Sequence, residues 1–193
     1  MTTNIILAGV GGQGILTIAA ILDTAALNNG LFFKQSEVHG MSQRGGAVQS
    51  HVRISEGEIY SDLIPMGKAD MILAVEPMEA LRYLPYLKED GWIITDGEAF
   101  DNIADYPEMD AVYKKIETVP NHKIINASHI AKKNGNVRGA NIVLLGAASP
   151  YIPIKDRAIR AAIKSLFERK GERIIASNLK VFEAGKALND LVS

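Results

Sequence analysis

The first fourteen residues constrain the fold more than any other stretch of the sequence. An apolar run from Ile5 to Ala8 predicts a short buried strand, and Gly9, Gly11 and Gly14 follow it with the spacing G-x-G-x-x-G. Glycines allow a sharp turn, and they let a bound group come close to the first amides of a following helix. Apolar residues then recur every three or four positions as far as Ala26. The chain therefore opens with the strand, tight turn and helix of a doubly wound α/β unit.

The later apolar runs extend this pattern over the whole chain. They predict strands at 31–33, 69–75, 92–95 and 123–126, and helices after 77, at 129–134, at 141–148, at 159–167 and from Ser177 or Asn178 onward. A right-handed crossover makes the strand at 31–33 parallel to the first. We therefore expect one domain, residues 1–193, with an α/β fold: a three-layer α/β/α, Rossmann-like arrangement around a mostly parallel sheet.

Four local features add detail to this plan. Residues 47–54 and 58–63 alternate in polarity on either side of a turn, which predicts an antiparallel β-hairpin. Gly146 lies inside an otherwise apolar helix and predicts close packing there, whereas Ser128 is a suitable cap for the helix that follows it. The stretch from Asp96 to Asp110 contains six acids without a clear period, and we interpret it as a solvated surface segment.

Composition excludes several classes of function. There is no cysteine, so the chain can form no disulfide, thiol nucleophile or cysteine-ligated cluster. The formal net charge is -1 with scattered acids and bases, which disfavours nucleic-acid and anionic-membrane partners. The apolar stretches are too short to span a bilayer, and no signal region is evident, so we expect a cytoplasmic protein.

The segment from Ser36 to Gly46 is the least ordinary part of the sequence. It holds glycines, a histidine, an arginine and a glutamate without an apolar period, so it is expected to be a loop. If the strands before it and before Gly9 are parallel, both loops lie at the carboxyl edge of the sheet, where open α/β folds bind ligands. Two interpretations stay open: a contact surface for a ligand or another subunit, or a structural connection in which Arg44 pairs with a carboxylate or a helix end.

Individual polar residues give weaker indications. Glu37 lies about twenty residues beyond Gly14, near the place of the acid that contacts a ribose in a Rossmann site. His39 and Glu37 are two residues apart, but two candidates do not make a metal site, and none is predicted. His51 falls on the polar face of its strand, either as a catalytic base or, more simply, as a solvated strand histidine.

Several separated stretches resemble one family. They are Gly9-Val-Gly-Gly-Gln-Gly14, Ser36-Glu-Val-His-Gly-Met-Ser-Gln-Arg-Gly-Gly46, Glu76-Pro-Met-Glu-Ala-Leu-Arg82, Asn141-Ile-Val-Leu-Leu-Gly-Ala147 and Asn178-Leu-Lys-Val-Phe-Glu-Ala-Gly185. Together they resemble the gamma-type domain of 2-oxoacid:ferredoxin oxidoreductases, and within that family the beta subunits of the indolepyruvate enzymes. The resemblance covers residues 3–190, and the second stretch is its most specific part.

This resemblance implies an accessory subunit that is inactive alone. In the family, a large alpha subunit carries thiamine diphosphate and iron–sulfur clusters. The complex oxidatively decarboxylates aryl pyruvates to acyl-CoA, with CoA as co-substrate and ferredoxin as electron acceptor. No cofactor is then expected in this chain, in agreement with its lack of cysteine. Apolar surface meant for the partner could cause the isolated chain to dimerise.

No catalytic residue can be assigned from the sequence. The candidates for an interface or ligand loop are Gly9, Gly11, Gly12, Gln13, Gly14, Glu37, His39, Gly40, Gln43, Arg44, Gly45 and Gly46. Two other functions remain open. The chain could be an independent NAD(P)- or flavin-binding oxidoreductase, or a non-catalytic module that binds another protein through the loop at Gly40–Gly46.

Overall fold

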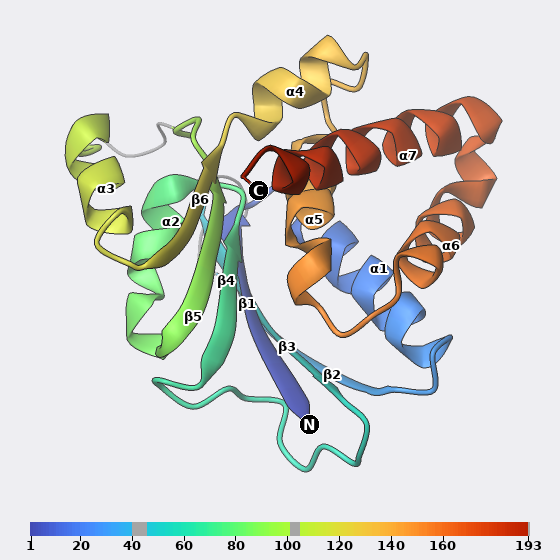
Figure 1. The fold of residues 1–193 in the computed structure, drawn as a ribbon, viewed down its shortest axis with the longest axis horizontal. Coiled ribbons are helices and arrows are strands. Elements are labelled where there is room, and N and C mark those ends of the chain that lie inside the picture. The colour runs from blue at the N-terminus through green and yellow to red at the C-terminus, as the bar shows by residue number, and fades with distance from the viewer. Residues whose placement is uncertain (40–45, 101–104, 193) are drawn as a thin grey trace.

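A six-stranded sheet forms the centre of the molecule (Figure 1). The computed structural model describes residues 1–39, 46–100 and 105–192. The strands are β1 (Thr2–Val10), β2 (Phe32–His39), β3 (Ala47–Ser55), β4 (Ala69–Ala74), β5 (Leu87–Asp96) and β6 (Asn121–Ile125). Their order across the sheet is β2-β3-β1-β4-β5-β6, and β1, β4, β5 and β6 are parallel. The expected mostly parallel α/β sheet is confirmed.

The antiparallel part of the sheet differs from the expected hairpin. Strand β3 pairs antiparallel with both β1 and β2, so β2 runs in the predicted direction but lies one strand further out. Because β2 continues to His39, residues 36–39 are strand rather than loop. Residues 58–63 form no strand, since Arg53 fixes them by donating to the Ser61 and Leu63 carbonyls.

Helices cover both faces of the sheet (Figure 1). They are α1 (Ile15–Leu27), α2 (Pro77–Arg82), α3 (Met109–Ile116), α4 (Ala127–Lys133), α5 (Ala140–Ala148), α6 (Asp156–Phe167) and α7 (Glu172–Lys186). Helices α1, α5, α6 and α7 pack over the larger hydrophobic core, whereas α2 and α3 cover a smaller one on the opposite face. The sheet and the helices on its two faces form the expected three layers.

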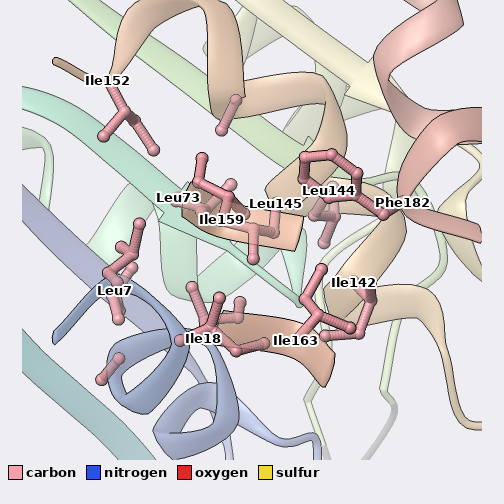
Figure 2. Close-up of a cluster of buried hydrophobic side chains, with 14 of the residues drawn as sticks. Leu7, Ile18, Leu73, Ile142, Leu144, Leu145, Ile152, Ile159, Ile163 and Phe182 are labelled. Carbon is pink, nitrogen blue, oxygen red and sulfur yellow. The ribbon is translucent and has the colours of Figure 1, made fainter. Parts of the chain in front are cut away.

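The larger core is built around α5. Figure 2 shows Leu144 and Leu145 of this helix among side chains from the sheet and the neighbouring helices, such as Leu73 and Phe182. Every residue from Asn141 to Ala148 is buried, as the unbroken apolar run predicts. The close packing expected at Gly146 is also confirmed, because a Cβ there would lie within 3.0 Å of the Phe182 carbonyl oxygen.

Helix α3 was not predicted, and helix α7 begins earlier than predicted. Helix α3 falls at the end of the acidic stretch that was interpreted as a surface segment, since Val112 and Ile116 lie one turn apart and bury one face in the smaller core. Helix α7 begins at Glu172 rather than near Ser177, because Gly171, with φ +86, ends the preceding turn at that point.

His51 is buried rather than solvated. Its side chain is 3% exposed, its Nδ1 accepts the Ile64 N–H at 2.9 Å, and its ring meets Tyr86 edge to face. Burial lowers the pKa of the imidazole, and the nearby Asp62 carboxylate only partly opposes that shift. The polar face of β3 is therefore covered by the segment that follows it, and His51 holds that segment in place.

Among the described helices, none has both the length and the apolar character needed to cross a membrane.

Candidate functional cleft

The glycine turn lies at the carboxyl edge of the sheet, between β1 and α1. The Gly11 N–H donates to the Gly46 carbonyl at 2.9 Å, which joins this turn to the start of β3. The Gln13 side chain folds back and accepts the Val10 N–H at 2.8 Å. These two hydrogen bonds hold the turn in place. Gly46, the last residue of the segment from Ser36 to Gly46, lies against the turn.

The two glycines nearest α1 adopt conformations that disfavour other residues. Gly12 has φ +99 with open space around its Cα, and Gly14 has φ +83. A Cβ on Gly14 would lie 2.5 Å from Asn141 Nδ2, which donates to the Gly14 carbonyl at 2.9 Å. Gly14 therefore serves the docking of α5 against α1, whereas Gly12 leaves its backbone open to the cleft beside it.

Asp96 ends β5 at the same edge of the sheet. Its side chain is buried and accepts four hydrogen bonds: one oxygen from the Ala127 and Glu98 N–H groups, the other from the Ser128 N–H and hydroxyl. Burial raises the pKa of this carboxyl group, and the hydrogen bonds oppose that rise. Ser128 is thus not the helix cap that was expected: it lies inside α4 and binds Asp96.

A cleft opens over these residues. One part, of about 670 Å³, lies between the end of β5 and helix α4, and a second part, of about 380 Å³, continues to the glycine turn. The two parts share Asp96, Glu98, Ser128 and Val137. This is where open parallel sheets bind their ligands, at the carboxyl ends of the strands.

Charged and titratable side chains line the cleft. The exposed side chains of His129, Lys132 and Arg138 line it, and Glu98 is the exposed acid among them. Asp96 is fully engaged by its four donors, so it fixes the junction of β5 and α4 instead of acting as a free base. The described residues contain no group of three His, Asp or Glu side chains placed to hold a metal ion.

The structure brings together part of the predicted site. Gly12 and Gln13 line the cleft, with Gly9, Gly11, Gly14 and Gly46 in or beside the turn. Glu37 lies on β2, and β3 separates it from β1, so it does not occupy the position of a Rossmann ribose-binding acid. His39 ends the same strand. Gly40, Gln43, Arg44 and Gly45 lie outside the described residues, and their roles stay predictions.

Sequence reasoning missed the other wall of the cleft. Asp96, Ser128, His129, Lys132 and Arg138 line the cleft but were not among the candidates. One signal was available: Asp96 directly follows an apolar inner strand, and the carboxyl ends of parallel strands meet at one edge. The acidic composition of the following residues concealed it.

Comparison with known proteins identifies the family. The sequence pattern described as pyruvate ferredoxin/flavodoxin oxidoreductase matches residues 4–188. The chain belongs to this family. Two relatives named indolepyruvate oxidoreductase subunit IorB illustrate the similarity. The protein from Thermococcus kodakarensis is 40% identical over 98% of this chain and 97% of its own length, and that from Methanothermobacter thermautotrophicus is 36% identical over 96% of each.

Solved structures agree with the fold. The gamma subunit of a keto/oxoacid ferredoxin oxidoreductase from Geobacter sulfurreducens is 27% identical, with a TM-score of 0.71 over 99% of both chains. A 2-oxoglutarate:ferredoxin oxidoreductase from Magnetococcus marinus gives a TM-score of 0.80 at 24% identity. This chain corresponds to 32% of that longer one, so the second likeness concerns the fold alone. The family of 2-oxoacid:ferredoxin oxidoreductase subunits is the one that the sequence motifs resemble.

Proposed function

We propose that this chain is the small accessory subunit of an indolepyruvate:ferredoxin oxidoreductase. The complex would oxidatively decarboxylate aryl pyruvates to acyl-CoA and pass electrons to ferredoxin. The observation that carries the proposal is the identity of 36–40% with four proteins named indolepyruvate oxidoreductase subunit IorB, each over at least 96% of this chain. The match also covers at least 94% of the length of each of these relatives.

The redox cofactors belong to the large partner subunit in this proposal. Iron–sulfur clusters are held by cysteine thiolates, and this chain has no cysteine. Its described residues also lack a cluster of His, Asp and Glu that fits a metal ion. The residues present therefore do not fit a resident cluster, and thiamine diphosphate with its metal is assigned to the same partner.

The contribution of this chain is then to complete the active site from outside. The glycine turn and the segment from Glu37 to Gly46 would pack against the large subunit near its cofactor. The cations of the cleft, Lys132 and Arg138, can bind an anionic group there, and Arg44 can do so through its planar fork of donors. A substrate carboxylate, a CoA phosphate and a partner carboxylate all satisfy this chemistry.

The test is to measure indolepyruvate-dependent reduction of a viologen dye in the presence of CoA. The large subunit is assayed alone and then with increasing amounts of this chain. We expect activity to appear only when both are present. Activity that does not change, at concentrations where the two chains associate in a pull-down, would contradict an essential accessory role.

Substitution of Arg44 tests the proposed role of the segment from Glu37 to Gly46. Arg44→Ala should lower the activity of the complex or the affinity between the subunits about tenfold, since a charge-assisted contact is lost. The midpoint of thermal unfolding of the isolated chain should stay unchanged. A collapse of thermal stability would instead assign Arg44 to an internal ion pair.

Nucleotide binding is the competing function, because Gly12 opens onto a cleft beside a helix start. The placement of Glu37 beyond β3 removes the acid on which a Rossmann site depends. Calorimetric titration of the isolated chain with NADH, NADPH and FAD should therefore show no binding. Saturable binding would favour an independent oxidoreductase.

A further inference from the structure

Strand β6 forms one border of the sheet and has a strand partner on one side only, within the described part of the chain. A groove of about 520 Å³ runs beside it. Five consecutive residues of this segment, 122–126, line the groove. Four of them, 122–125, belong to β6, and successive side chains of a strand point to opposite faces, so a groove lined by all four reaches the outer edge of the strand.

The backbone of β6 is oriented to accept another strand. The Ile125 carbonyl accepts the Gly97 N–H at 2.8 Å, so the polar backbone groups of Ile125 face β5. Backbone direction alternates along a strand, which turns the N–H and C=O groups of His122 and Ile124 outward. An edge with outward backbone groups is a template for pairing with an added strand.

The walls of the groove are apolar and basic. Ile130 of α4 and Leu188 near the end of the chain line it together with Trp92 of β5. Its charged or titratable residues are His122, Lys123 and His129, and none of the described residues that line it is acidic. Lys123 extends over the rings of Trp92 and Tyr151 and donates to Asn189, so its ammonium group is held beside the groove wall that Trp92 forms.

These features also argue against a second copy of this chain as the occupant. A symmetric antiparallel pair centred on Lys123, the middle residue of β6, would place two lysines opposite each other. Like charges directly opposite are destabilising in a sheet. The groove instead complements an extended segment in which apolar side chains alternate with carboxylates.

We infer that β6 binds an extended, acidic and apolar segment of the large partner subunit, which adds a seventh strand to the sheet. The inference rests on the proposed function and deepens it by naming a surface of contact. Asn126 and His129 line both this groove and the cleft at the carboxyl edge. A segment bound along β6 therefore leads directly to the cleft where the two chains would share the active site.

Proline substitution tests the pairing. His122→Pro removes an N–H that faces outward and leaves the bonds to β5 intact, whereas His122→Ala removes the same imidazole but keeps that N–H. We expect His122→Pro to lower the affinity for the large subunit at least about tenfold, and His122→Ala only about twofold. Equal affinities for the two variants, with both folded by circular dichroism, would overturn the inference.

Charge reversal tests the chemistry of the occupant. His129→Glu places an acid in the groove, and Lys133→Glu makes a larger change of charge on an exposed residue of the same helix outside it. The first variant should lower the affinity for the large subunit severalfold at low salt, and the second should leave it unchanged. A reversed order would exclude an acidic segment.

Hydrogen exchange of the unmodified proteins covers the case in which a variant fails to fold. The His122 and Ile124 amides should exchange rapidly in the free chain and slowly in the complex, whereas the Lys123 amide is protected in both. A complex that forms with both amides still exchanging rapidly would overturn the groove inference and leave the proposed function standing. Failure to form any complex would remove the proposed function itself. Protection that rises with the concentration of this chain alone would show self-pairing, against the inference.

The single tryptophan of the chain provides an independent signal. Trp92 lines the groove, so its fluorescence should shift when the large subunit binds. The shift should be absent for His122→Pro under conditions where the wild-type chain is saturated. A full shift with that variant would place the partner elsewhere.

Discussion

The crossing of α5 with α7 and the turn before α1 both depend on glycine, but for different reasons. At the crossing, Gly146 and Gly185 have ordinary helical backbones, and a Cβ on either would lie within 3.0 Å of a backbone carbonyl of the other helix. At the turn, Gly12 and Gly14 have positive φ, and Gly12 has open space around it. Glycine is needed at the crossing because there is no room for a side chain between the helices. It is needed at the turn because other residues rarely adopt a positive φ.

This difference separates packing from function among the stretches that resemble the family. The stretches that contain Gly146 and Gly185 belong to the buried interface of two helices. Glu76 likewise serves the fold, since it is buried and caps α2 by accepting the Glu79 N–H. Among the described residues of these stretches, Gly12 and Gln13 line the cleft, and Gly46 is hydrogen-bonded to the turn beside them. Resemblance in α5 and α7 therefore reflects the fold, whereas resemblance at the turn concerns residues of the candidate site.

Gly185→Ala should have the largest effect on stability. Its methyl group would meet the Val143 carbonyl oxygen and backbone, which cannot move without separating α5 from α7. We expect a loss of at least about 3 kcal/mol in the free energy of unfolding, measured in urea. Gly57→Ala is the matched control, because a Cβ there meets nothing within 4 Å, and it should be close to neutral. A loss below about 1 kcal/mol at Gly185 would mean that the helices cross less closely than described.

Gly14→Ala combines both kinds of constraint. The new alanine would have to keep φ +83, and its methyl group would press on Asn141 Nδ2. A loss of about 2–3 kcal/mol in the free energy of unfolding is expected. Gly30→Ala provides the reference, since Gly30 has φ +69 in open space and should lose only about 1 kcal/mol. Equal losses of unfolding free energy in the two variants would show that the Asn141 side chain moves aside without destabilising the fold.

The sequence was sufficient to predict the layers of the fold and the glycine turn, because both are written in local patterns. Apolar runs identified β1, β4 and α5, and helical periodicity identified α1 and α6. The insertion of β3 between β1 and β2 could not be predicted in this way. It depends on pairing between Ile5 and Val52, which are distant in the chain, and a local pattern says nothing about which strands become neighbours.

The candidate site was predicted only on one side for the same reason. The turn at Gly11–Gly14 follows directly from a strand and its helix, so its position is local. Asp96 is defined by its donors Ala127 and Ser128, which lie 31 and 32 residues further along the chain. Without knowledge of that contact, a carboxylate in an acidic stretch of sequence resembles a surface residue. Asp96 differs from the other described acids of that stretch in being buried, and the composition of the stretch does not show this.

Asn141 connects the two regions, and a double-mutant cycle measures that connection. Asn141→Ala removes the donor to the Gly14 carbonyl and should lose about 1–2 kcal/mol in the free energy of unfolding. It also removes the atom that a methyl group on residue 14 would touch. The double variant with Gly14→Ala should therefore lose about 1 kcal/mol less than the sum of the single losses. Strict additivity in urea unfolding would contradict the contact between the regions.

Gly12→Ala should have a smaller effect on stability than Gly185→Ala or Gly14→Ala, and the most informative effect on function. Like Gly30→Ala it places a methyl group at positive φ in open space, so both variants should lose about 1 kcal/mol in the free energy of unfolding. Gly12 also lines the cleft, and Gly30 lies after α1, away from it. In the assay with the large subunit, Gly12→Ala should therefore lower indolepyruvate-dependent activity severalfold while Gly30→Ala leaves it unchanged. If both variants keep full activity, the glycine turn serves the fold, as the α5–α7 crossing does. The cationic side chains of the cleft would then be the part to test.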